Sequence, residues 1–390
     1  MMSQAATDDR PVSFFRSGFG NDPLLLGVTV IILAVGIVMV TSAGYMIASG
    51  KFGDGFYYTK RQGVSMLIGL ALMFLFSRIN PRFWKEFAGP VMAVGLLLLI
   101  LVFIPGLGVE LGGSRRWIKM PLGFFLQPSE LIKYALIIFF AHSLAKKGEG
   151  IKAFTIGFLP HILVIALVIL LVLVQPDFGS AVIITTVGFL MMFVAGVRIQ
   201  HLAGCCILAL PFLIQIGISA QYRLSRLKSF LDPWGDPLSS GFQVIQSLVA
   251  FGCGGAWGAG VGKGIQKLFY LPQPQSDFIF SVIGEELGLI GVISVILLFC
   301  ALVFKGFLVS VKCQDQFNKL LAFGITSLIG IQAFLNMAVA MGMLPTKGLP
   351  LPLISLGGTS MIVNLAGIGI LLAISGAERQ AEKDGAPCDC

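Results

Sequence analysis

The sequence predicts an all-α integral membrane protein with about ten transmembrane helices and one large extracytoplasmic loop between helices seven and eight. Charged residues make up only 12% of the 390 residues, against about 25% in soluble domains, so there is too little charge to cover a soluble surface. Hydrophobic residues make up 56% of the chain, and its 48 glycines suit the close helix contacts of membrane bundles. These observations exclude an ordinary soluble protein.

Ten hydrophobic segments are long enough to cross a hydrocarbon core about 30 Å thick. Their approximate ranges are 24–46, 63–76, 87–104, 129–144, 153–174, 178–197, 202–219, 282–304, 320–341 and 359–375. An even number of crossings places both chain ends on one side of the membrane. We therefore divide the chain into an N-terminal tail (1–22), one membrane domain (23–376) with its outer loop at 220–281, and a C-terminal tail (377–390) that we expect to be disordered.

Positive charges orient the chain, because the cytoplasmic loops of membrane proteins are rich in Lys and Arg. With both ends inside, the inner segments hold 14 Lys and Arg and the outer segments hold 12, of which five lie in the long loop and count little. Both termini are therefore expected in the cytoplasm. The outer face still keeps many cations, among them Arg61, Arg116 and Lys119. They fit either contact with lipid headgroups or recognition of an anionic substrate, a phosphate in particular.

Asp277 is the strongest catalytic candidate. It stands where the long loop enters the eighth segment, beside Phe278 and Phe280. Burial at such an apolar boundary raises the pKa of a carboxyl group and makes it a better general base. The alternative, that Asp277 only caps the N-terminus of the helix, fits the sequence equally well.

Two further charged sites lie at the outer ends of predicted helices. Glu130 and Lys133 are three residues apart on one helical face, so they can pair within the membrane. A structural ion pair and a lysine that binds substrate are both open interpretations. Asp177 follows Gln175 and Pro176 at a predicted helix start, where a capping role is favoured.

A glycine-rich run at 258–264 resembles a phosphate-binding loop only superficially. A P-loop needs Gly, four residues and then Gly-Lys-Ser/Thr, whereas Lys263 is followed by Gly264. The spacing therefore argues against nucleotide binding.

Five segments resemble the SEDS family of polytopic membrane proteins, which act in shape, elongation, division and sporulation. They follow one another along most of the chain as G-S-R-R-W-I (113–118), Q-P-S-E-L-I-K (127–133), Q-P-D-F-G-S-A (175–181), S-D-F-I-F-S-V-I-G-E-E (276–286) and L-P-T-K-G-L-P-L-P-L-I-S-L-G-G-T-S (344–360). The L-P-T-K-G form, with Lys347, resembles the division branch of the family.

The resemblance implies a peptidoglycan glycosyltransferase that polymerises lipid II, the undecaprenyl-pyrophosphate-linked disaccharide pentapeptide. It also implies that polymerisation takes place at the outer face of the bacterial cytoplasmic membrane, at the division septum. Asp277 matches the catalytic Asp of the family. The other motif positions are matched by Arg116, Trp117, Glu130, Lys133, Asp177 and Lys347. Candidates for binding the diphosphate are Arg116, Lys133, Arg61 and Arg223.

In the expected mechanism, Asp277 takes the proton from the acceptor 4-hydroxyl as this oxygen attacks the anomeric carbon of the donor. Undecaprenyl pyrophosphate leaves as an anion that cations can stabilise, so the paired carboxylates of a glycosidase are not needed. No residue pattern demands a cofactor, and a divalent cation such as Mg²⁺ or Mn²⁺ bridging the diphosphate is left open.

The resemblance also implies partners: a class B penicillin-binding protein with transpeptidase activity and other division proteins, besides lipid II and the surrounding membrane lipid. Nucleic acid is not expected among them. Two alternatives to polymerisation are a lipid II flippase and a non-catalytic scaffold of the division machinery. A flippase would need charged groups along a path at mid-membrane, where Gln332 and Asn336 are polar but neutral.

Overall fold

The computed structural model describes residues 22–111, 114–120, 125–219, 221–237, 241–268, 271, 273–346 and 348–384. Ten of its helices correspond in order to the ten predicted segments. They are α1 (Pro23–Phe52), α2 (Tyr57–Arg78), α4 (Ala88–Leu101), α5 (Pro128–Ala145), α6 (Leu159–Val174), α7 (Phe178–Ala195), α8 (Ile199–Ser219), α11 (Ile279–Lys312), α12 (Gln316–Ala340) and α13 (Gly358–Asp384). By length and composition, six of the described helices can each cross a membrane. The prediction of an all-α, multi-pass membrane protein is confirmed.

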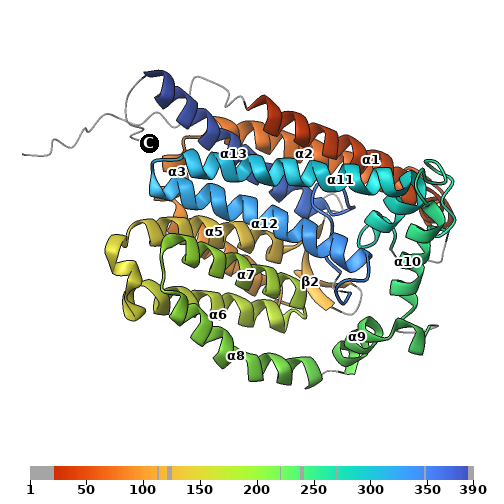
Figure 1. Ribbon diagram of the computed structural model, residues 1–390, viewed down its shortest axis with the longest axis horizontal. Helices are drawn as coiled ribbons and strands as arrows, with labels where there is room; N and C mark the ends of the chain where they lie inside the picture. Colours follow the sequence, from red (N-terminus) through yellow and green to blue (C-terminus); the bar gives the residue numbers. More distant parts are fainter. Residues whose placement is uncertain are drawn as a thin grey trace, which may run out of the picture.

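The helices pack side by side into one bundle (Figure 1). α13 lies along α2, α11 along α12, and α4 along α5. α12 and α13 are buried over most of their length, whereas α6 and α11 expose much of theirs. Short turns complete the connections, namely α3 (Pro81–Glu86), the 3-10 turn η2 (Gly148–Lys152) and the π turn η3 (Phe154–Phe158).

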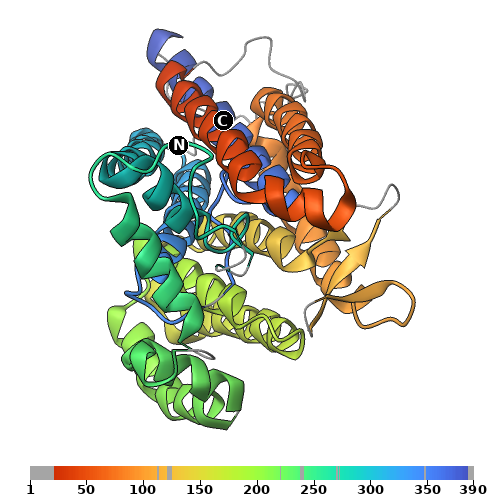
Figure 2. The same cartoon turned by 90° about the vertical axis from the view of Figure 1, so that its right-hand side faces the viewer.

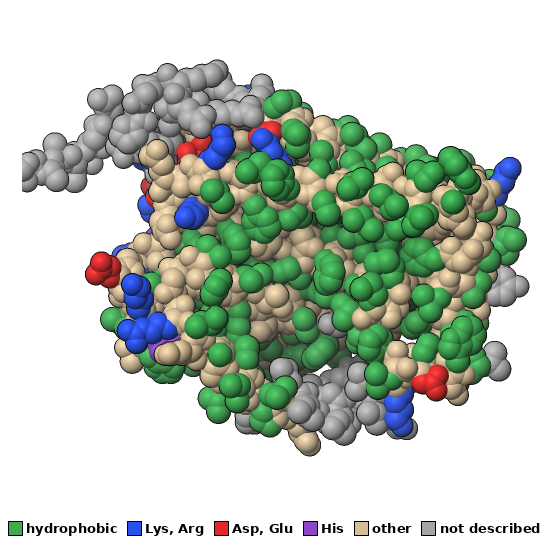
Figure 3. Space-filling view, viewed as in Figure 1, with side chains coloured by type: hydrophobic (Ala, Val, Ile, Leu, Met, Phe, Trp, Pro, Cys, Tyr) green, Lys and Arg blue, Asp and Glu red, His purple; other side chains and the backbone are tan. Residues whose placement is uncertain are grey.

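The exterior carries a broad apolar band. On the face seen in Figure 3, hydrophobic side chains cover the middle of the molecule, and the charged side chains lie toward its two ends. On α11, for example, Leu297 is 61% and Phe304 is 65% exposed. Continuous apolar surface of this extent is unfavourable in water, so the band is the part that lipid covers.

The start of α1 and the end of α13 meet at one end of the bundle. Asp22 caps α1 by accepting from the Leu25 amide at 3.3 Å. Its other carboxylate oxygen pairs with Lys305 at 3.1 Å and accepts from Ser375 at 3.2 Å. The start of α1 and the C-terminal part of α13 therefore lie at the same end of the bundle.

The expectation of a disordered tail from residue 377 is wrong for its first part. α13 continues to Asp384, and Ala377 and Glu378 are buried. Glu378 lines a pocket with Lys305 and Lys312 of α11, so the helix is still packed against the bundle at this point.

The opposite end of the bundle, which we call the site end, holds the non-helical structure (Figure 2). Strands β1 (Gly108–Leu111), β2 (Ser114–Lys119) and β3 (Phe125–Leu126) form an antiparallel sheet in the order β1-β2-β3. The sequence did not predict this sheet. The long loop contains α9 (Gln221–Leu231), the turn η4 (Pro233–Gly235) and α10 (Phe242–Gly254).

The glycine-rich run packs against a kink in α11. Gly288 interrupts α11 with φ 66° and ψ −163°. There the Leu289 amide donates to the Gly255 carbonyl at 2.9 Å. Gly258 has a φ of +80°, and a Cβ at this position would lie 2.2 Å from the Glu286 carbonyl oxygen. The glycines therefore serve close contact between two backbones.

Candidate functional site

Asp277 lies at the site end, two residues before α11 begins. The N-cap residue of α11 is Phe278, and no side chain caps this helix. The alternative interpretation of Asp277 as a helix cap is therefore wrong, because the helix begins one residue too late for it. Its carboxylate is available for another role.

The main chain around Asp277 is held from two directions. The Asn336 side-chain amide donates to the Asp277 carbonyl at 3.0 Å and to the Leu349 carbonyl at 2.6 Å. The Ser355 hydroxyl donates to the Ser276 carbonyl at 2.6 Å. Thus α12 and the segment at 348–357 both fix the turn that carries the Asp277 carboxylate.

The surroundings of Asp277 have opposing electrostatic effects. Burial raises the pKa of the Asp277 carboxyl above its usual range, while the Ser276 hydroxyl and the guanidinium groups of Arg116 and Arg226 act to lower it. Burial is the largest effect, so the net shift is upward. A carboxylate with a raised pKa is a stronger base than an exposed one, and two nearby cations suit a site for an anion.

Arg116 reaches this site from the sheet. It lies on the central strand β2, and the neighbouring Trp117 pairs with Val109 of β1. Arg116 Nε is buried and has no hydrogen-bond partner in the part of the chain that the structure describes. A buried donor without a partner is costly, so this atom is suited to a bound acceptor.

Thr359 ties the sheet to the bundle. Its hydroxyl, in the first turn of α13, donates to the Phe125 carbonyl at 3.0 Å and accepts from the Gln127 amide at 3.0 Å. The same side chain therefore fixes the end of β3 and the start of α5. β3 in turn pairs with β2, the strand that carries Arg116, so this contact ties that edge of the sheet to the bundle.

Arg226 is a further candidate at the site that was not predicted from the sequence. It lies on α9, and its Nη1 donates to the Thr346 carbonyl at 3.2 Å. The only sequence signal was its membership of a basic amphipathic stretch with Arg223. The Arg223 side chain and Lys347 lie outside the described parts of the structure, so their proposed contacts stay predictions.

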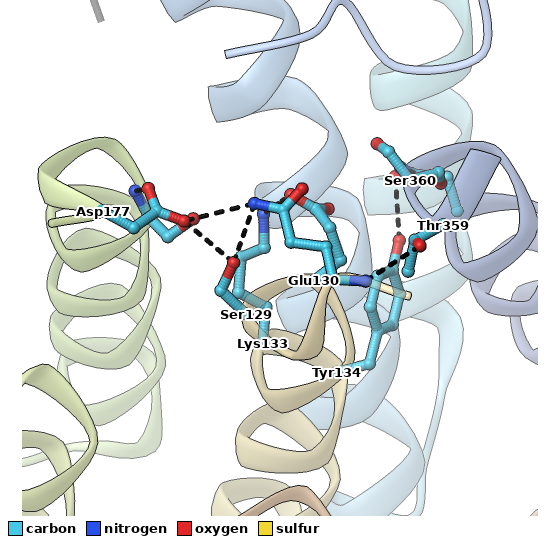
Figure 4. A network of polar contacts seen from close by, with 10 residues as sticks. Ser129, Glu130, Lys133, Tyr134, Asp177, Thr359 and Ser360 are labelled. Carbon is cyan, nitrogen blue, oxygen red and sulfur yellow. Dashed lines mark hydrogen bonds and ion pairs between the residues drawn. The ribbon is translucent and has the colours of Figure 1, made fainter. Parts of the chain in front are cut away.

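Glu130 and Lys133 form the predicted ion pair in the first turns of α5 (Figure 4). The distance from Lys133 Nζ to Glu130 Oε1 is 2.7 Å, and both side chains are buried. Glu130 Oε2 has no hydrogen-bond partner among the described residues. Next to the pair, the Tyr134 hydroxyl donates to Asn364 at 2.9 Å.

Asp177 has the predicted capping role. It caps α7, where its carboxylate accepts from the Ser180 amide at 3.1 Å and from the Ser180 hydroxyl at 2.8 Å. It also accepts from the Ser129 hydroxyl at 2.8 Å and from the Gln127 side-chain Nε2 at 3.3 Å, which links α7 to α5 (Figure 4). Four protein donors already occupy this carboxylate, so binding of a substrate by Asp177 stays a prediction that its geometry does not favour.

Arg61 lies on α2, and its neighbour Gln62 donates to the Ser355 carbonyl at 3.1 Å. The Arg61 guanidinium lies 5.8 Å from the Tyr57 ring centroid and 5.9 Å from that of Phe125, so it stacks near the β3 end of the sheet. Among the described residues, no group of three His, Cys, Asp or Glu side chains gathers as a metal site. The question of a divalent cation therefore stays open, as the sequence left it.

The comparisons with known proteins cover almost the whole chain. The family model described as a cell cycle protein, that of FtsW, RodA and SpoVE, matches residues 23–380. A probable peptidoglycan glycosyltransferase FtsW of Geobacter metallireducens is 50% identical, covering 91% of this chain and 94% of the relative. Stage V sporulation protein E of Bacillus subtilis is 40% identical, covering 91% and 96%.

Two solved structures have the same arrangement of helices. One chain, from a peptidoglycan synthase complex that coordinates polymerization and crosslinking, has a TM-score of 0.75 at 31% identity and covers 91% of this chain and 98% of its own. The rod shape determining protein RodA of Thermus thermophilus has a TM-score of 0.67 at 29% identity, covering 90% and 95%. The chain therefore belongs to the FtsW, RodA and SpoVE family, the SEDS family that its five motifs resemble.

Proposed function

We infer that this protein is a peptidoglycan glycosyltransferase that polymerises lipid II, with Asp277 as the general base. The observation that carries this proposal is a single carboxyl group of raised pKa, flanked by Arg116 and Arg226, at one end of a membrane bundle. The names of the relatives support the same activity.

The reaction needs one base and a site for an anionic leaving group. Asp277 accepts the proton of the GlcNAc 4-hydroxyl of the acceptor as that oxygen forms the new bond to the anomeric carbon of the donor MurNAc. The bond from this carbon to the diphosphate breaks, and undecaprenyl pyrophosphate leaves with its electron pair. Positioned general bases contribute about 10²- to 10⁴-fold to such transfers.

The cations complete the proposed site. Arg116 offers its buried Nε, and Lys133 offers an ammonium whose hydrogen bond among the described residues goes to Glu130 alone. Both groups suit the non-bridging oxygens of a diphosphate, because charge-assisted hydrogen bonds to such oxygens are strong. The apolar band would hold the polyprenyl chain in the membrane while the headgroup reaches the site end.

A transpeptidase partner is also proposed. A chain of similar fold is part of a peptidoglycan synthase complex, which supports a class B penicillin-binding protein as the partner here. Action at the septum, with both termini in the cytoplasm, follows from the division-type motif and the distribution of Lys and Arg.

The test compares the wild type with Asp277→Asn. Each protein, purified with its class B penicillin-binding protein, is incubated with lipid II, and glycan strands are separated on a gel. We expect polymer from the wild type and a loss of about 10²- to 10⁴-fold in the variant. Equal polymer from both would disprove the role of Asp277, and no polymer from either, with lipid II moved across vesicle membranes, would favour a flippase.

A further inference from the structure

A buried asparagine on α12 makes two hydrogen bonds to the chain around Asp277. Asn336 is 2% exposed, and its Nδ2 donates to the carbonyls of Asp277 and Leu349 at 3.0 and 2.6 Å. An amide nitrogen has two hydrogens, and each has one acceptor here. With the amide turned over, its oxygen would face two carbonyl oxygens, so these acceptors fix the orientation of the side chain.

The oxygen of the same side-chain amide makes no hydrogen bond that would offset its burial. Asn336 Oδ1 is buried and has no hydrogen-bond partner in the described ranges. A buried polar atom without a partner costs stability, so this side chain is a poor device for stabilising the fold alone. Its two donated bonds instead have a specific geometric effect, because they join two separate chain segments beside the catalytic carboxylate.

The two segments that Asn336 joins both border the Asp277 carboxylate. One is the turn before α11 that carries Asp277 itself. The other contains Gly348, where a Cβ would lie 3.4 Å from Asp277 Oδ2, and Leu349, whose carbonyl Asn336 holds. Next to it, the Thr346 carbonyl accepts from Arg226. One side chain thus sets the spacing between the base, the backbone beside it and the segment that one arginine contacts.

We propose that Asn336 is a positioning residue for the glycosyl transfer, holding Asp277 at its working distance from the acceptor hydroxyl and from the two arginines. This inference rests on the proposed function of Asp277. Asn336 does not itself touch the reacting atoms. Its effect should therefore appear in kcat and in the pH profile, and the binding of lipid II should change little.

The test substitutions are Asn336→Leu, which removes both donors at similar volume, and Asn336→Ser, which can reach at most one carbonyl. The matched control is Asn318→Leu, because Asn318 is also on α12 and 1% exposed but lies near the opposite end of the helix. All variants are purified with the penicillin-binding protein, and rates are measured on the monodisperse fraction across a range of lipid II concentrations and pH values.

We expect Asn336→Leu to lower kcat on the order of 10²-fold, as displacement of a reacting group by about 1 Å can do. Asn336→Ser should fall between this variant and the wild type, and the lipid II concentration at half-maximal rate should change less than about threefold in both. Since the released carboxyl moves away from Arg116 and Arg226, the acid limb of the kcat profile should move to higher pH. Asn318→Leu should behave as the wild type.

Two results would overturn the proposal. One is a normal kcat in folded Asn336→Leu and Asn336→Ser while Asp277→Asn is inactive, which would leave the function of Asp277 intact and remove only Asn336. The other is a rate of the Asn336 variants that decreases only in proportion to their folded fraction, with an unchanged pH profile. This result would assign Asn336 a structural role. Full activity of Asp277→Asn would overturn the proposed base, and this inference with it.

Discussion

Two buried Lys–Glu pairs in the membrane domain differ in how their oxygen atoms are used. Glu286 of the first pair accepts from Lys267, from the Ser42 hydroxyl at 2.7 Å and from the Gly262 amide at 3.1 Å. Lys267 also donates to Ser42 at 2.8 Å. This pair therefore joins α1, α11 and the glycine-rich run, and we call it saturated because both carboxylate oxygens of Glu286 have partners.

The second pair, Glu130 and Lys133, is buried to the same degree but is not saturated. One carboxylate oxygen accepts from Lys133, and the other has no partner among the described residues. Within the same ranges, Lys133 Nζ donates to Glu130 alone, although an ammonium has three N–H groups. The second pair therefore keeps more unused hydrogen-bonding groups than the first, and we predict that only the second pair binds a ligand.

The largest expected effect is on the saturated pair. Lys267→Met leaves Glu286 buried without its cation, which should cost about 3 to 5 kcal/mol of unfolding free energy. Lys267→Met combined with Glu286→Gln should recover most of this loss, because no charge is then left buried. The measurement is unfolding in detergent, together with polymer yield per folded protein, which should stay near that of the wild type. A large loss of specific activity in the double variant would show that this pair is more than structural.

The unsaturated pair should respond in the opposite way. Lys133→Met combined with Glu130→Gln removes both charges, so the fold should remain. Loss of a charge-assisted bond of about 1.5 to 3 kcal/mol should raise the lipid II concentration at half-maximal rate about 10- to 150-fold. Titration of lipid II against the polymerisation rate measures this shift, with the double variant at Lys267 and Glu286 as the control. An unchanged half-maximal lipid II concentration would show that Lys133 does not bind the substrate and that both pairs are structural.

The two arginines beside Asp277 sharpen the comparison between buried and exposed cations. Arg116→Ala should raise the half-maximal lipid II concentration about tenfold, because a partly buried cation is little screened. Arg226 is exposed, so Arg226→Ala should raise it about threefold or less, and added salt should reduce the difference from the wild type. Equal effects of the two substitutions, at low and high salt alike, would contradict this ranking.

The sequence predicted the parts of the molecule that local patterns determine. Ten hydrophobic segments became ten helices, Asp177 became a cap, and Glu130 paired with Lys133, since each depends on neighbours within a few residues. The predicted start of the disordered tail at residue 377 was wrong, because contacts with distant helices keep Glu378 buried and helical.

The parts that were missed depend on contacts between distant segments. The β1-β2-β3 sheet has strands of two to six residues, which are too short to show a pattern and become stable only by pairing. Arg226 approaches Asp277 from 51 residues earlier in the chain, and Asn336 from 59 residues later. Nothing in the spacing of these residues indicates such contacts.

The smallest expected effect is a shift in pH dependence, and its sign tests the electrostatic description of Asp277. A general base works only when deprotonated, so the rate should fall as the pH drops through the pKa of Asp277. Burial raises this pKa and the two arginines oppose the rise, so Arg116→Ala should move the acid limb of the rate profile further toward higher pH. Lys267→Met should leave the limb where it is, because the cations that act on this carboxyl are Arg116 and Arg226. If Arg116→Ala moved the limb to lower pH or not at all, Arg116 would not lie close enough to Asp277 to share a diphosphate site with it.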